Sequence, residues 1–211
     1  MEQLKLIPCY EGRSVGDAYP DFHALNGNMS DAELMAFLRT ACAYGDPKAD
    51  VSTPAEAAAF LNSLSEQANR MIAGGLMARK GEFIIEPSCC CGLEGWREWY
   101  SLSDGIGSPW LGHDPSPWVE AKDGQFVLHT DEDEQAESLT VPAGELAAAL
   151  DQARADLDAF AAVLRAWISR ECVPDGAKMC DRLELWFSIG EANAKGPQVH
   201  GWAITAMPPR D

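Results

Sequence analysis

Residues 118–129 read WVEAKDGQFVLH, with two five-residue runs of strand-forming character on either side of Asp123-Gly124. Asp-Gly between such runs predicts a two-residue type I′ turn, because this turn needs a positive φ at both central positions. The segment therefore predicts an antiparallel hairpin made of strands 118–122 and 125–129.

The chain after this hairpin predicts a long amphipathic helix from residue 141 to about residue 170. Its apolar residues alternate steps of four and three, at Leu146, Leu150, Ala153, Leu157, Phe160, Leu164 and Trp167. Such a helix is about 28 residues long and spans about 42 Å. A single stripe of this kind most often packs within its own domain, and the alternative is a homodimer seam.

Two further helices are predicted in the first third of the chain, and each begins with a capping box. Ser30 with Glu33 starts a helix over 31–43, and Thr53 with Glu56 starts one that extends to about residue 73. In this interpretation Gly74-Gly75 supplies the left-handed exit from the second helix.

Four other short apolar runs predict strands, at 4–7, 82–86, 183–189 and 199–205, the first of them broken at Pro8. Together with the hairpin they give the expected fold class, α+β. We expect one domain over 1–211, with a mostly antiparallel sheet of about five or six strands and all three helices packed on it.

Charge restricts the kinds of partner. The chain has 16 Lys plus Arg against 33 Asp plus Glu, a net charge of −17, and its basic residues are scattered. Nucleic acid and anionic membranes are therefore not expected partners. The field could steer a basic protein partner, or the acidity could serve solubility alone. Without a long apolar run or a signal-like start, the expected location is cytoplasmic.

The unusual chemistry of the sequence lies between Ser88 and Trp118. Seven cysteines cannot all pair within one chain, so reduced thiols are expected, and three of them are consecutive at 89–91. Aromatic and polar side chains that could form a binding surface follow them: Trp96, Trp99, Tyr100, Trp110, His113, Asp114 and Trp118.

Three interpretations of this segment remain open. A zinc site could join the cysteines to His113, but consecutive cysteines lack the usual ligand spacing, so no metal ligand or cofactor is assigned. A thiol enzyme could use His113 as base with Asp114 or Glu98 as orienter, but no catalytic motif occurs, so no catalytic residue is assigned. The aromatic residues could instead form a protein interface, or fill the core.

Three motifs carry a resemblance, namely Cys-Cys-Gly-Leu at 90–93, Trp-Arg-Glu-Trp at 96–99 and Trp-Leu-Gly-His-Asp-Pro at 110–115. The stretch from Pro87 to Glu120 is similar to the central part of uncharacterised bacterial proteins. The order of Trp-x-x-Trp helix, hairpin, acidic loop and helix is loosely similar to SMI1/KNR4-type immunity proteins. The two long helices ahead of the first central strand depart from that pattern, and the similarity implies only an interaction protein.

The leading hypothesis is a non-catalytic acidic protein-binding module of the immunity or inhibitor kind, which captures a basic protein through its aromatic loops. The alternative is a thiol- or zinc-dependent enzyme centred on Cys89, Cys90, Cys91 and His113.

Overall fold

The computed structural model describes residues 2–12, 21–65, 71–102, 105 and 107–190. Within these ranges the chain forms two antiparallel sheets and five helices, which confirms the predicted α+β class. In chain order the elements are β1 Lys5–Glu11, β2 Phe22–Ala24, α1 Asp31–Gly45, α2 Pro54–Ser63, β3 Gly74–Lys80, β4 Phe83–Ile85, the 3₁₀ helix η1 Leu93–Leu102, β5 Trp118–Lys122, β6 Gln125–His129, β7 Ser138–Pro142, α3 Ala143–Arg170 and α4 Gly176–Phe187.

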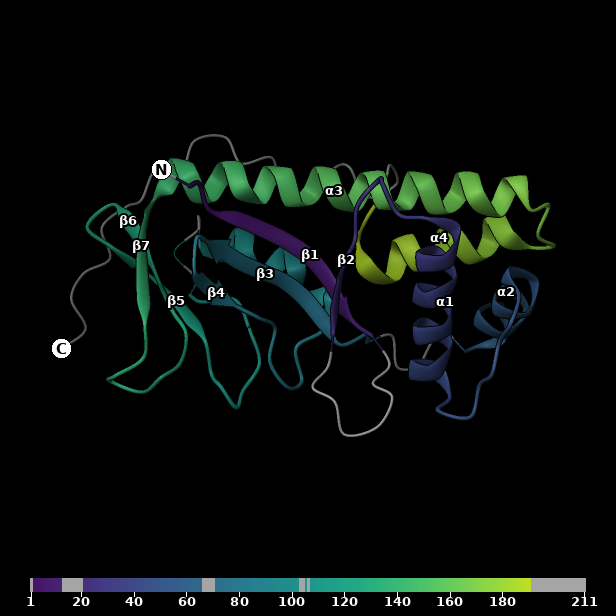
Figure 1. The fold of residues 1–211 in the computed structure, drawn as a ribbon, viewed down its shortest axis with the longest axis horizontal. Helices are drawn as coiled ribbons and strands as arrows, with labels where there is room; N and C mark the ends of the chain where they lie inside the picture. The colour runs from purple at the N-terminus through teal and green to yellow at the C-terminus, as the bar shows by residue number, and fades with distance from the viewer. Residues whose placement is uncertain (1, 13–20, 66–70, 103–104, 106, 191–211) are drawn as a thin grey trace.

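The long helix α3 organises the molecule (Figure 1). It runs along one side of the elongated fold, beside β1 in the middle and beside β6 and β7 at one end. Helices α1, α2 and α4 gather at the other end, where α4 packs against both α3 and α2. In the described chain, no helix is both long and apolar enough to cross a membrane.

The strands divide into two sheets where the sequence predicted a single sheet of five or six. A four-stranded sheet has the order β2-β1-β3-β4, and a three-stranded sheet has the order β5-β6-β7. The predicted break at Pro8 is wrong, because β1 continues to Glu11. The carbonyl of Pro8 accepts from Leu25 N–H (2.8 Å), one residue beyond the end of β2. The N–H that proline lacks would therefore have been needed only where the β1–β2 pairing ends.

The second N-terminal helix is shorter than predicted. Both capping boxes form, but α2 ends at Ser63, and Gly74-Gly75 begins β3 instead of closing a helix. Gly75 lies opposite Cys9 in β1, and Gly74 packs so closely on β1 that an added Cβ would lie 2.3 Å from the Cys9 carbonyl oxygen. Close backbone approach, which glycine permits in a strand, explains the pair better than a helix exit does.

The hairpin is confirmed with the predicted strand bounds, and its turn has φ values of 50° at Asp123 and 80° at Gly124. A third strand, β7, pairs with β6 and was not predicted; its last two residues, Val141 and Pro142, were wrongly assigned to the start of the long helix. The predicted long helix follows at once as α3, and its apolar stripe is buried against this chain's own elements.

The predicted strand 183–189 is wrong: residues 183–187 form the last part of helix α4, and Ser188 and Ile189 follow it. The alternation of Leu183, Leu185, Phe187 and Ile189 suggested a strand, yet Leu185 is 63% exposed while Leu183 is buried. The chain forms a helix here because the helical pattern extends over 12 residues and buries five side chains together, namely Met179, Cys180, Leu183, Trp186 and Phe187. The other predicted C-terminal strand, 199–205, lies outside the described residues.

The core joins elements that are distant in sequence. The ring of Phe37 in α1 lies 5.3 Å from Tyr10 of β1, 4.9 Å from Phe160 of α3 and 6.3 Å from Phe187 of α4, measured between ring centroids. The loop region from Ser88 to Pro117 connects the four-stranded sheet to the hairpin, and it is there that the unusual residues lie.

Candidate functional site

Two short backbone segments hold the site together. Residues 88–91 follow β4 as a turn, in which Cys91 N–H donates to the Ser88 carbonyl (3.1 Å). Residues 111–113 lie antiparallel to this turn: Ser88 N–H donates to the Leu111 carbonyl (2.9 Å), and His113 N–H donates to the Cys89 carbonyl (3.1 Å). These hydrogen bonds bring His113 beside cysteines that lie more than 20 residues earlier in the chain.

Gly112 makes this contact possible. Its φ is +97°, and a Cβ at this position would lie 2.5 Å from the carbonyl carbon of Ser88. Only glycine combines this backbone angle with such a close approach. The close packing of the two segments therefore requires glycine at the position before His113.

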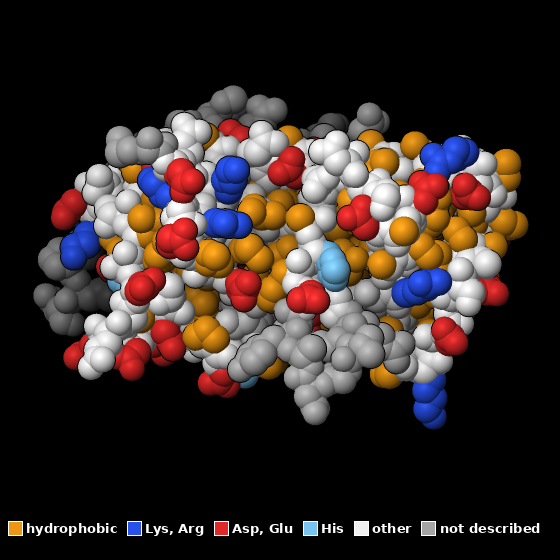
Figure 2. Space-filling model, in the orientation of Figure 1, with side chains coloured by type: hydrophobic (Ala, Val, Ile, Leu, Met, Phe, Trp, Pro, Cys, Tyr) orange, Lys and Arg blue, Asp and Glu red, His pale blue; other side chains and the backbone are white. Residues whose placement is uncertain are grey.

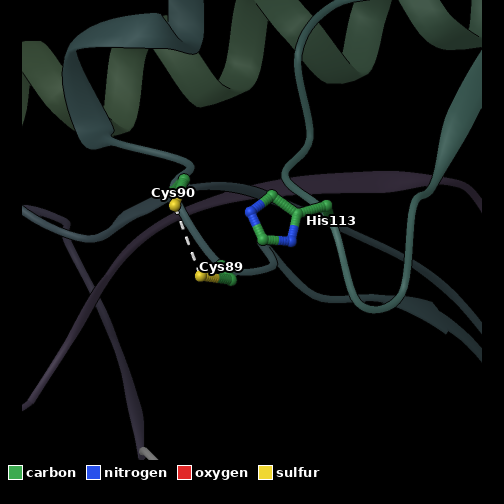
Figure 3. A group of neighbouring side chains, drawn as sticks. All are labelled: Cys89, Cys90 and His113. Atoms are coloured by element: carbon green, nitrogen blue, oxygen red, sulfur yellow. Dashed lines mark hydrogen bonds between the residues drawn. The ribbon is translucent and has the colours of Figure 1, made fainter.

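Three donor side chains meet at this bridge, namely Cys89, Cys90 and His113. The two sulfur atoms are 3.3 Å apart, and the sulfurs and an imidazole nitrogen all lie within 4.8 Å of one another. Figure 3 shows the imidazole facing the two thiols. Cys90 takes a left-handed backbone conformation, with φ of +67°, and the peptide bond that joins it to Cys89 is trans.

The charges of this cluster are coupled. The hydrogen bond from the Cys89 thiol and then the neighbouring His113 lower the pKa of Cys90, whereas the same thiol–thiol hydrogen bond raises the pKa of Cys89. His113 Nδ1 lies 2.9 Å from Asp114 Oδ2, and this contact is the main reason that the pKa of His113 is raised. Of the three consecutive cysteines, Cys90 is thus the one that most readily becomes a thiolate.

Trp110 supports the same loop from the side. Its indole N–H donates to the Cys90 carbonyl (3.0 Å), and its backbone N–H donates to Glu98 Oε2 (2.9 Å). Its ring centroid lies 6.3 Å from that of His113, and the side chain remains 52% exposed. Trp110 therefore fixes the loop at Cys90 while it also presents an aromatic surface.

The third consecutive cysteine does not belong to the cluster. Cys91 is buried, and its thiol points toward the Trp110 carbonyl at 3.5 Å. Burial raises its pKa to about 12, so this thiol stays protonated at neutral pH. The exposed cysteines are Cys89, Cys90 and Cys172.

The predicted aromatic surface is only partly on the surface. Trp96, Trp99 and Tyr100 are buried in the core, where Trp96 donates its indole N–H to the Phe187 carbonyl (2.8 Å). Trp118 is half-buried and stacks on His129 with a centroid distance of 4.1 Å. Trp110, His113 and Asp114 remain together at an accessible place.

An open cleft of about 950 Å³ adjoins the two exposed thiols. Cys89, Cys90 and Asp114 contribute to its wall, together with residues from β4 and from the loop before β5. Sequence reasoning missed this cleft, because its walls come from separate parts of the chain that range from Glu11 to Thr130. The cluster, by contrast, could be predicted in part, because the adjacent cysteines and His113 stand out in the sequence.

Comparisons of this chain with protein-family models, with curated proteins and with solved structures found no match. The arrangement of the site itself is therefore the basis for a functional proposal.

Proposed function

We propose that this protein is a zinc-dependent enzyme whose ion is held by Cys89, Cys90 and His113. The observation that carries the proposal is the meeting of two thiols and one imidazole within 4.8 Å at the wall of an open cleft. Thiolate sulfur and imidazole nitrogen are the donors that zinc prefers, and three protein ligands with a remaining open position are typical of catalytic zinc sites.

The distances suit one shared ion. Zinc–sulfur bonds of about 2.3 Å in a tetrahedral site put two sulfurs roughly 3.8 Å apart. The observed separation of 3.3 Å needs only a small outward movement of two exposed side chains. The usual paired spacing of zinc ligands is missing, and the backbone bridge between residues 89 and 113 replaces it.

A disulfide between Cys89 and Cys90 is a less favourable use of the pair. A trans peptide fixes neighbouring Cα atoms about 3.8 Å apart, which is below the usual range of about 4.4–6.8 Å for disulfides. Such a bond would be strained and easily reduced. Joint coordination of an ion requires no S–S bond, so the same two thiols serve it without that strain.

Asp114 supports the proposed site without binding the ion itself. It contacts Nδ1 of His113, which leaves Nε2 for the ion, and a carboxylate in this position orients a ligating histidine. When bound, zinc would supply Lewis-acid chemistry and a water of lowered pKa at the open position. This chain's part is to deprotonate Cys90 readily, orient the imidazole and keep the open position next to the cleft.

Metal binding tests the proposal directly. Reduced protein with one equivalent of zinc is expected to show one bound zinc ion in native mass spectrometry, and cobalt(II) in its place should give thiolate–cobalt absorption. Cys90→Ser and His113→Ala should each weaken zinc binding more than about 100-fold, since partners outside the ligand shell alone account for about 10- to 100-fold.

Cys172→Ser is the matched control, because Cys172 is exposed but lies outside the cluster. Its zinc stoichiometry should equal that of the unmodified protein. Failure of the unmodified protein to bind zinc at micromolar concentration, or full retention of zinc by Cys90→Ser, would refute the zinc site.

Capture of a basic protein is a second proposal, supported by the exposure of Trp110 beside His113 and Asp114 on a chain of net charge −17. Figure 2 shows acidic side chains spread among hydrophobic ones over the visible face, without one dominant patch. A Trp110→Phe variant keeps an aromatic ring but loses the indole donor, whereas Trp110→Ala loses both. If Trp110 anchors a partner, Trp110→Ala should reduce binding to an identified basic partner far more than Trp110→Phe does.

A further inference from the structure

The cleft beside Cys89 and Cys90 has a wall of consistent chemistry. Ile84, which is 40% exposed, lines it together with four further apolar residues, namely Ile85, Pro87, Pro115 and Pro117. Apolar clefts of several hundred cubic ångströms are where proteins hold small molecules. The size and lining therefore suit the hydrophobic body of a small ligand.

Its charged groups all have one sign. Glu11, Glu86 and Asp114 contribute carboxylates, and none of the described residues that line the cleft is Lys, Arg or His. An anion placed here would meet only repulsion from the lining, whereas a cation would be attracted. Zinc with two thiolates and one neutral imidazole carries no net charge, so the proposed ion would not reverse this preference.

We infer that the cleft binds a small molecule with an apolar body and a positively charged group, and that this is the substrate class of the site. The inference rests on the proposed zinc site, which gives a reason for a ligand to be held beside Cys90. The apolar body lies along Ile84, Ile85 and the prolines, and the cation lies toward Glu11 and Glu86. The same charges disfavour phosphorylated and carboxylate substrates.

Three probes of equal chain length separate the contributions: hexyltrimethylammonium, 1-hexanol and hexanoate. The quaternary ammonium group cannot ligate zinc, so its binding reports the cleft alone. Calorimetric titration of the metal-free protein, in which neither the hydroxyl nor the carboxylate of a probe can ligate zinc, should show the cation binding about three- to tenfold more tightly than the alcohol, as expected for two solvent-accessible carboxylates, with hexanoate weakest.

The double variant Glu11→Gln/Glu86→Gln leaves only the Asp114 carboxylate in the lining, so it should remove most of the preference for the cation and leave 1-hexanol binding unchanged. Its matched control is Glu132→Gln/Glu134→Gln, which removes the same net charge from the acidic loop outside this cleft. The control should keep the preference, because only the local carboxylates act on the bound group. Equal loss in the two double variants would overturn the inference, as would hexanoate binding as tightly as the cation.

Repeating the titration with metal-free Cys90→Ser separates the two proposals. The same preference in this variant supports the cleft inference whatever the zinc experiment shows. Absence of the preference in the unmodified, metal-free protein overturns it even where zinc binds as proposed.

Discussion

Gly112 is the residue on which the geometry of the site most depends. Replacing it by alanine adds a methyl group 2.5 Å from the Ser88 carbonyl carbon and forces alanine to a φ of +97°. We expect Gly112→Ala to lower the free energy of unfolding by roughly 2–4 kcal/mol, the sum of overpacking and backbone strain. Denaturant titration measures this loss, and zinc affinity should fall as well because His113 moves with its neighbour.

Gly105→Ala provides the comparison. Gly105 also has a positive φ, of +66°, but an added Cβ would meet nothing within 4 Å. This variant should therefore carry only the backbone cost, about 1 kcal/mol. Equal losses in the two variants would mean that close packing against Ser88 contributes nothing.

The cysteines should differ sharply in reactivity in the metal-free protein. Cys90 is exposed and its pKa is lowered, whereas burial raises the pKa of Cys9, Cys42 and Cys91 to about 12. Because the thiolate is the reacting form, iodoacetamide near neutral pH should label Cys90 first and leave these three buried thiols unlabelled until the protein unfolds. Peptide mass spectrometry at successive times measures the order in which the cysteines are labelled. Early labelling of Cys91 would contradict the prediction.

Element α4 makes a prediction that separates helix from strand. In the helix, Leu183 is buried and Leu185 is exposed, although a strand would place both on one face. Leu183→Ala should cost about 2–4 kcal/mol of unfolding free energy, and Leu185→Ala less than about 0.5 kcal/mol. Similar losses in the two variants would favour the strand interpretation instead.

The start of α1 should respond to pH. In its capping box Glu33 Oε2 accepts from the backbone N–H and the hydroxyl group of Ser30 (2.7 and 2.6 Å), and these bonds lower the pKa of Glu33 below 4.5. A carboxyl whose folded pKa is lowered stabilises the fold above its unfolded pKa, and this stabilisation is lost as the pH falls through the folded pKa. Glu33→Ala should therefore cost more stability at pH 7 than at pH 3.

Unfolding free energies of the Glu33→Ala variant and of the unmodified protein, measured at pH 7 and at pH 3, test this prediction. The cap contribution of the Ser30 hydroxyl is expected to be about 1 kcal/mol, read from Ser30→Ala at pH 7. An unchanged difference between Glu33→Ala and the parent protein at the two pH values would show that the ionised carboxylate has no role.

At the scale of the whole molecule, α3 contacts β1, α4 and the three-stranded sheet. We expect the described elements to unfold together, because a shared apolar helix couples the stability of everything packed on it. Far-ultraviolet circular dichroism and tryptophan fluorescence should give the same midpoint in urea. Two separated transitions would show instead that the sheets belong to units that unfold independently.

The site illustrates how far sequence reasoning reaches. Its ingredients were visible, since Cys89, Cys90 and His113 stand out in an irregular segment. The sequence did not predict that these three side chains meet. Ligand spacing along the chain argued against a zinc site, and hydrogen bonds between two loop segments cannot be predicted from one sequence. The aromatic hypothesis was weakened for a related reason: burial of Trp96 and Trp99 depends on which elements cover η1.

The sequence by itself determined the elements whose signals are local. Capping boxes set the starts of α1 and α2, Asp123-Gly124 set the hairpin turn, and steps of three and four set the length of α3. Only the tertiary structure decided between competing periods at 183–187, made Gly74 and Gly75 part of a strand, and divided the strands into two sheets. These outcomes depend on which surfaces are buried together, and burial is a property of the assembled fold.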